Sequence, residues 1–107
     1  NKDMFEKAGI TEIPDSLEAI EAVGDKLLSD GGAGEVMSLS IYGWFFEQFM
    51  GKQGLEYANN GNGREKAATA VAFDENGGAK NILTAWKSLY DKGFAPNVGK
   101  GGDAGLA

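Results

Sequence analysis

The side chains best suited to contact a ligand in this chain are the aromatic rings that gather between residues 40 and 51. Tyr42 and Trp44 stand where a predicted helix begins, and each ring carries a polar group. Rings at the end of a structural element commonly offer a flat apolar face to a sugar or a base. For these two rings, a core position and a surface position both remain open. The phenylalanines that follow are expected in the core, namely Phe45, Phe46 and Phe49.

The composition excludes several classes of chemistry. The 107 residues include no cysteine and no histidine, which excludes disulfides, thiolate metal sites and an ordinary Ser-His-Asp triad. Ten basic against sixteen acidic residues give a net charge of −6, and the basic residues are scattered. The nearest approach to a basic patch is Arg64 with Lys66. Because phosphate backbones are bound by clustered Lys and Arg, we expect no nucleic-acid partner.

A hydrolase is the enzyme alternative, and it would depend on Glu47, one helical turn beyond Trp44. A glycosidase uses two carboxyl groups about 5–9 Å apart across a cleft. The sequence places no second acid opposite Glu47, and the acids Glu18 and Glu21 share a helix face that we expect to be solvated. The Asn- and Asp-containing stretches indicate turns and helix caps, because their oxygen ligands are too sparse for a calcium loop. We therefore expect no catalysis, no metal and no cofactor.

Hydrophobic periodicity predicts three or four helices. The expected ranges are 2–8, 17–30 after a cap at Asp15 or Ser16, 43–50, and 79–92. Gly24, inside the second of these, indicates either a close contact or a tolerated glycine. In the last helix the 3.6-residue period predicts a core-facing stripe, made of Ile82, Leu83, Trp86, Leu89 and Tyr90.

Two short strands are also predicted. Val36–Ile41 alternates apolar with small or polar residues and leads into the aromatic helix, and Ala67–Phe73 favours a strand over a helix. Ala58–Gly63, rich in Asn and Gly, is expected to be a turn or a mobile loop. Residues 99–107 are expected to form a disordered tail. By size, residues 1–107 form one domain or part of one, of mainly helical α+β class.

The order of several motifs resembles the extracellular solute-binding proteins of bacterial ABC importers, carbohydrate type, in the glycerol-3-phosphate-binding branch. Asn1–Gly9 matches the pattern N-K-D-x-F-x-K-A-G, and Pro14–Glu18 matches a helix start P-x-S/T-W/L-D/E. The run Y-G-W-F-F-E-Q at 42–48 also resembles that branch, as do A-F-D-x-x-x-G-A-K at 72–80 and W-K-x-L-Y-D-K-G at 86–93. The resemblance covers nearly the whole chain.

The resemblance implies a middle fragment of the helix-rich C-terminal lobe of a two-lobed, periplasmic-binding-protein-like (type II) fold. In such proteins the lobes close around a solute like a hinge. Carried onto this chain, the ligand-binding positions are Tyr42 and Trp44, with Ser40 as a hydroxyl partner. Relatives often have Trp where this chain has Ile41, and that difference changes the stacking surface of the pocket.

The same resemblance implies a sugar or glycerol-phosphate solute, an ABC permease as partner of the full-length protein, and a periplasmic or lipid-anchored location. No segment approaches the length of a membrane-spanning helix. The fragment alone is expected to bind solute weakly and to self-associate, because it exposes former interdomain surface. The alternative function is a protein-interaction module that uses the aromatic cluster, since such rings are enriched at interfaces.

Overall fold

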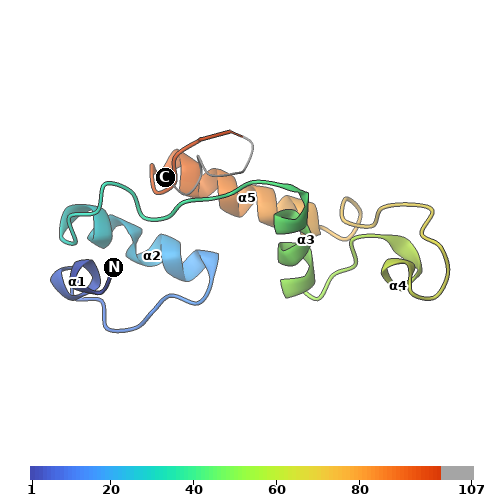
Figure 1. The fold of residues 1–107 in the computed structure, drawn as a ribbon, viewed down its shortest axis with the longest axis horizontal. Helices are drawn as coiled ribbons and strands as arrows, with labels where there is room; N and C mark the ends of the chain where they lie inside the picture. The colour runs from blue at the N-terminus through green and yellow to red at the C-terminus, as the bar shows by residue number, and fades with distance from the viewer. Residues whose placement is uncertain (100–107) are drawn as a thin grey trace.

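The computed structural model of the chain describes residues 1–99. The molecule is elongated, with extents of 52 × 27 × 21 Å (Figure 1). Its radius of gyration is 16.4 Å, whereas a compact domain of this length has one of about 13 Å. The predicted tail at 99–107 lies outside the described residues except for Gly99. The helices within the described range are α1 (Lys2–Lys7), α2 (Leu17–Ser29), α3 (Gly43–Lys52), α4 (Asn59–Gly63) and α5 (Gly78–Asp91).

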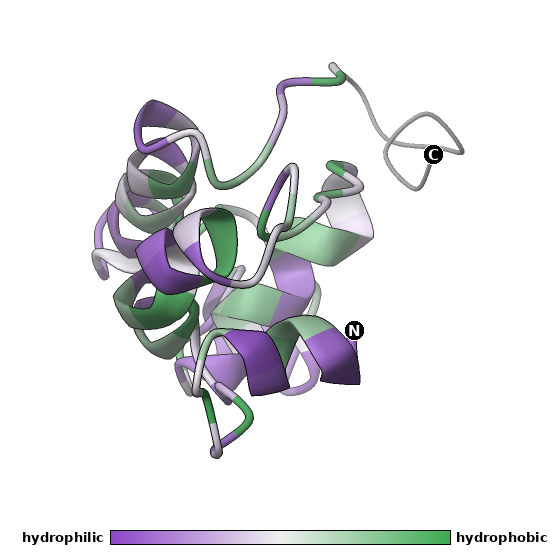
Figure 2. Ribbon diagram, turned by 90° about the vertical axis from the view of Figure 1, so that its left-hand side faces the viewer, coloured by the Kyte–Doolittle hydropathy of each residue, from purple (hydrophilic) through white to green (hydrophobic). Residues whose placement is uncertain are grey.

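The N-terminal helices begin at side-chain caps. The Ser16 hydroxyl accepts a hydrogen bond from the Ala19 amide at 3.1 Å, so Ser16 rather than Asp15 caps α2. The Asn1 side chain accepts from the Asp3 amide at 3.0 Å and caps α1 in the same way. Each cap satisfies an amide that has no partner inside its helix. Hydrophilic and hydrophobic bands alternate along the helices in Figure 2, as the sequence period predicts.

Helix α5 is the centre of the fold, because α2 and α3 both pack against it. Two groups of buried side chains share it. The first, here the Phe94 cluster, consists of Leu39, Leu89, Phe94 and Ala95. The second, here the Trp86 cluster, consists of Met50, Ile82 and Trp86.

The predicted core stripe of α5 is confirmed in part. Ile82, Trp86 and Leu89 are buried, whereas Leu83 and Tyr90 are more than half exposed. The prediction was wrong for Leu83 and Tyr90 because α2 and α3 cover only one side of the helix. An amphipathic pattern identifies an apolar face without saying how wide a part of it is covered.

The predicted strand at Val36–Ile41 is wrong, because the described residues form no strand there and only Ile41 is an isolated bridge residue. Instead this segment attaches to the loop after α5. The amides of Val36 and Met37 both donate to the carbonyl of Phe94, at 2.8 and 3.0 Å. Leu39, two residues further on, is buried in the Phe94 cluster. Val36 and Met37 pack against the same cluster and Ile41 is exposed, so the alternating pattern does not separate a buried side from an exposed one.

The second predicted strand, Ala67–Phe73, is also wrong, because the described residues there contain a single antiparallel bridge between Ala58 and Val71. The segment 58–63, predicted to be a turn or a mobile loop, contains the single left-handed turn labelled α4. Asn60, Gly61 and Asn62 have φ angles of 57°, 61° and 57°, a region that Asn and Gly tolerate best. The mainly helical part of the predicted fold class is thus confirmed.

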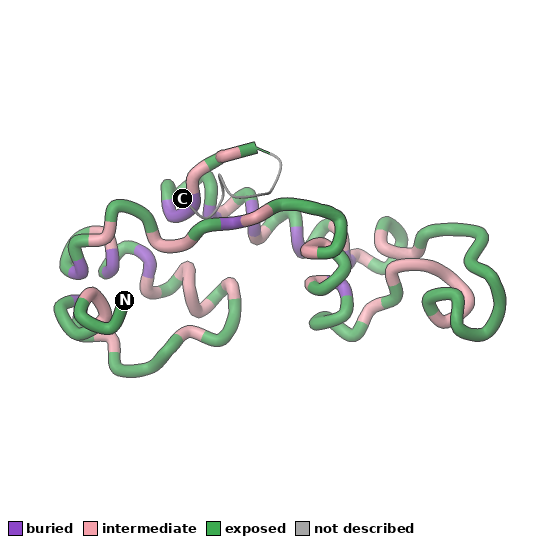
Figure 3. The backbone as a smooth tube through the Cα atoms, in the orientation of Figure 1, coloured by how far each residue is buried: buried purple, intermediate pink, exposed green. Residues whose placement is uncertain are grey.

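Burial is uneven along the molecule. Figure 3 shows the buried positions along α2, α5 and the segments next to them. Between residues 51 and 77 no residue is fully buried. Aromatic contacts connect residues 51–77 to the Trp86 cluster. The ring centroid of Phe46 lies 6.1 Å from that of Tyr57 and 5.5 Å from that of Phe73.

Candidate functional site

Tyr42 and Trp44 lie on the surface at the start of α3. Their exposed fractions are 41% and 59%. Tyr42 is the N-cap residue, with extended backbone angles of φ −154° and ψ 169°, and its carbonyl accepts from the Phe45 amide at 3.1 Å. Tyr42 therefore precedes the part of α3 that packs against α5. Of the two positions that the sequence leaves open for these rings, the surface position is the observed one.

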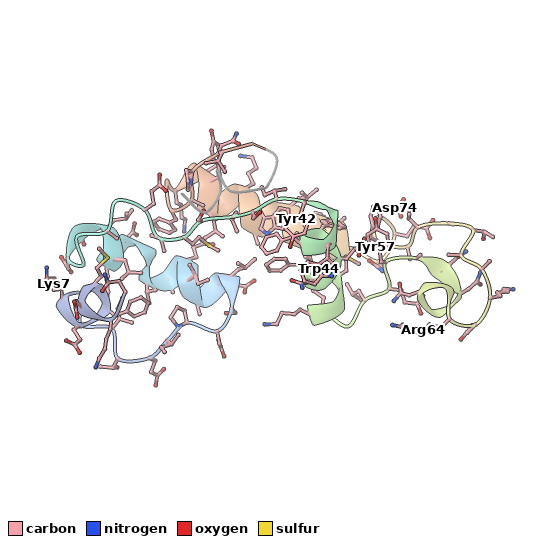
Figure 4. The ribbon with its side chains drawn as sticks, viewed as in Figure 1. Lys7, Tyr42, Trp44, Tyr57, Arg64 and Asp74 are labelled. Atoms are coloured by element: carbon pink, nitrogen blue, oxygen red, sulfur yellow. The ribbon has the colours of Figure 1, made fainter. Side chains whose placement is uncertain are left out.

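The two exposed rings continue an aromatic stack that reaches the core. The ring centroid of Tyr42 lies 6.0 Å from that of Trp44 and 6.2 Å from that of Phe45. Phe45 in turn stacks on Trp86 at 5.6 Å, with an angle of 17° between the ring planes. Figure 4 shows Tyr42 and Trp44 together at α3, away from Arg64 at the far end of the molecule. The exposed pair is therefore continuous with the packed rings around Trp86.

The three phenylalanines are half-buried rather than fully enclosed. Phe45, Phe46 and Phe49 all contact the ring of Trp86, at centroid distances of 5.6, 6.4 and 5.6 Å. They therefore pack against the core, as predicted, but form its edge. The Nε1 of Trp86 is buried and has no hydrogen-bond partner among residues 1–99, a feature that costs free energy in a folded chain.

The other predicted candidates have different surroundings. Ser40 is half-buried and Glu47 is exposed. Gly43 begins α3, no side chain caps that helix, and a Cβ at Gly43 would meet nothing within 4 Å. The described residues contain no group of three or more Asp, Glu, His or Cys that could hold a metal ion.

A groove of about 1010 Å³ opens between α2, α3 and α5. Its floor is apolar and includes Ile20, Phe49 and Ile82. Neither Tyr42 nor Trp44 lines it. This groove was not predicted from the sequence. The small residues Thr84, Ala85 and Ser88 of α5 leave space beside that helix, but they do not indicate where α2 and α3 lie.

Beside the groove, an ion pair links α2 to the residue that follows α5. Lys92, which follows α5, donates to the carboxylate of Glu21 on α2. This hydrogen bond lowers the pKa of Glu21, against a smaller opposing effect of desolvation. The ammonium of Lys92 also lies 5.9 Å from the centroid of the Phe94 ring. The ion pair therefore lies beside the Phe94 ring.

Comparison with protein-family models, with curated proteins and with solved structures found no match. Among the helices of residues 1–99, none has the length and apolar character needed to cross a bilayer.

Proposed function

We propose that this chain is part of the ligand-binding lobe of an extracytoplasmic solute-binding protein of an ABC importer. The proposed lobe is non-catalytic and belongs to a two-lobed, type II binding-protein fold. The observation that carries the proposal is the exposed pair Tyr42 and Trp44, which stand on a stack of rings reaching Trp86. The order of sequence motifs supports the same assignment.

The chemistry of the pair suits a carbohydrate or a polyol phosphate. An indole or phenol ring offers an apolar face to the C–H face of a sugar, and its polar group can bind a hydroxyl. A phosphate group could bind at the start of α3, where no side chain caps the helix and Gly43 leaves open space. Ser40, two residues before the N-cap residue Tyr42, is the proposed hydroxyl partner.

In the full-length protein the remaining contacts would come from other segments, and the loaded protein would deliver its solute to an ABC permease. The experiment therefore uses the product of the complete reading frame that contains this chain. Titration with glycerol 3-phosphate, glycerol and a maltooligosaccharide is followed by tryptophan fluorescence and by calorimetry. We expect saturable binding of one of these solutes, and at least a tenfold weaker affinity in Trp44→Ala.

The control is Leu83→Ala, another exposed hydrophobic residue, for which we expect unchanged affinity. An absence of binding to all three solutes, or an affinity unaffected by Trp44→Ala, would contradict the role proposed for this ring. Circular dichroism of each variant separates a lost contact from a lost fold.

The second candidate function is a protein-interaction module. It is favoured by three large exposed side chains that are close in sequence. The exposed fractions of Ile41, Tyr42 and Trp44 are 40%, 41% and 59%. Exposed aromatic residues are common anchors in interfaces. A protein complex that is lost in Trp44→Ala and unaffected by added sugars would support this function over solute binding.

A further inference from the structure

The surface of this chain is larger than a folded monomer of its size requires. Its accessible area is 7132 Å², whereas a compact chain of 11.3 kDa exposes about 5,700 Å². The groove between α2, α3 and α5 is a concave part of that surface.

The charges around the groove have opposite signs on its two sides. Asp15 and Glu18 line it from the α2 side, and Lys52 and Lys80 line it from α3 and α5. All four side chains are exposed, and none forms an ion pair within residues 1–99. Glu21, the third acid that lines the groove, is paired with Lys92, so two acids and two lysines remain unpaired and make the groove complementary to itself. A two-fold axis would place the acids of one copy against the lysines of another.

An exposed apolar side chain directly precedes the residues that line the groove. Ile13 is 86% exposed, more than any other large hydrophobic residue of the described chain, and Pro14 beside it lines the groove. The half-buried floor offers Ile20 and Phe49 beside the buried Ile82. A large exposed side chain next to an open apolar groove is the arrangement by which a residue of one copy fills the groove of another.

We infer that two copies of this chain form a two-fold dimer in which the segment 13–18 of each lies in the groove of the other. Ile13 contacts the apolar floor of the partner copy. Asp15 and Glu18 lie against its Lys52 and Lys80. This dimer goes beyond the proposed solute binding and uses a surface that excludes Tyr42 and Trp44.

The first test measures the dimer dissociation constant of the 107-residue chain by sedimentation equilibrium. We expect Ile13→Ser to weaken the dimer at least tenfold. Two control substitutions, Leu83→Ser and Trp44→Ala, remove other exposed hydrophobic side chains and should leave the constant unchanged. A chain that is monomeric up to millimolar concentration would overturn the inference. A dimer weakened by Trp44→Ala and not by Ile13→Ser would also overturn it, because it would place the interface on the aromatic face.

The second test exchanges charges. One variant carries Asp15→Lys with Glu18→Lys, and the other carries Lys52→Glu with Lys80→Glu. Each variant alone places like charges in contact and should be monomeric. An equimolar mixture should form a heterodimer that weakens as salt is added. Both variants alter exposed residues, so far-UV circular dichroism should be unchanged. Failure of the mixture to associate, with both variants folded, would overturn the proposed arrangement.

Discussion

The ring of Phe94 lies directly against the backbone of Gly24, so that a Cβ at position 24 would stand 2.5 Å from Cε2 of the ring. Phe94 is fully buried, with no accessible surface. The glycine therefore allows the loop after α5 to pack on α2, which explains a glycine inside a helix at a cost of about 1 kcal/mol relative to alanine. Through this contact the Phe94 cluster packs against α2.

Gly24→Ala should therefore lower the free energy of unfolding by about 1–3 kcal/mol, because the added methyl group forces the Phe94 ring or α2 to shift. Urea denaturation followed by circular dichroism measures the change. The matched control is Gly51→Ala in α3, where a Cβ would meet nothing within 4 Å. There the higher helix propensity of alanine should raise stability by about 0.5–1 kcal/mol. Equal effects at the two sites would contradict the packing role of Gly24.

The two tryptophans should report different environments in fluorescence. Trp44 is 59% exposed and Trp86 is 8% exposed. A Trp44→Phe variant should emit at shorter wavelength than the unmodified chain and resist quenching by iodide. A Trp86→Phe variant should emit at longer wavelength and be quenched readily. If the iodide quenching constants of the two variants were the same, the exposed position of Trp44 would be wrong.

The left-handed turn should depend on Asn62 in two separable ways. Its Oδ1 accepts from the amides of Tyr57 and Ala58 at 2.7 and 2.9 Å, and its φ angle is positive. Asn62→Ala loses both properties and should cost about 1–3 kcal/mol. Asn62→Gly keeps the φ preference and loses only the acceptor, so it should cost less. Asn62→Asp keeps the acceptor. Thermal unfolding ranks the three variants, and an alanine variant as stable as the unmodified chain would contradict the role of both properties.

Acid should weaken the contact between α2 and the end of α5. The hydrogen bond from Lys92 lowers the pKa of Glu21 in the folded chain. A lowered pKa means that the folded state favours the charged carboxylate. The resulting stability is present above the ordinary pKa of a glutamate and is lost as the pH falls through the lowered one. Lys92→Met should remove this part of the acid dependence, measured as denaturation midpoints at a series of pH values. If the denaturation midpoints of the unmodified chain and of Lys92→Met changed in parallel with pH, the role of this hydrogen bond would be contradicted.

Local signals in the sequence predicted the helices well. Ser16 and Gly31-Gly32 delimit α2, and the apolar period of α5 predicted Ile82, Trp86 and Leu89 in the core. These features depend on neighbours within one or two turns, and such neighbours are visible in the sequence. The surface position of Tyr42 and Trp44 was one of two open alternatives, because an aromatic pattern does not say which side of a helix start is covered.

Features that depend on distant partners could not be predicted. The alternation in Val36–Ile41 is the pattern of a strand, but a strand also needs a neighbour, and the partner here is the carbonyl of Phe94. The contact of Gly24 with Phe94 joins residues seventy positions apart. The groove likewise arises from three helices whose relative positions no local pattern specifies.

The absence of fully buried residues between 51 and 77 has a consequence for motion. This end is tied to the rest by ring contacts from Tyr57 and Phe73 to Phe46 and by hydrogen bonds between Gln53 and the residues Gly78 and Asn81. It can open as a separate unit while α2 and α5 stay together. In deuterated water the backbone amides of this end would exchange well before those of α5. The chain would then lose its order in two stages, and the first would leave the aromatic pair on α3 still standing on its stack.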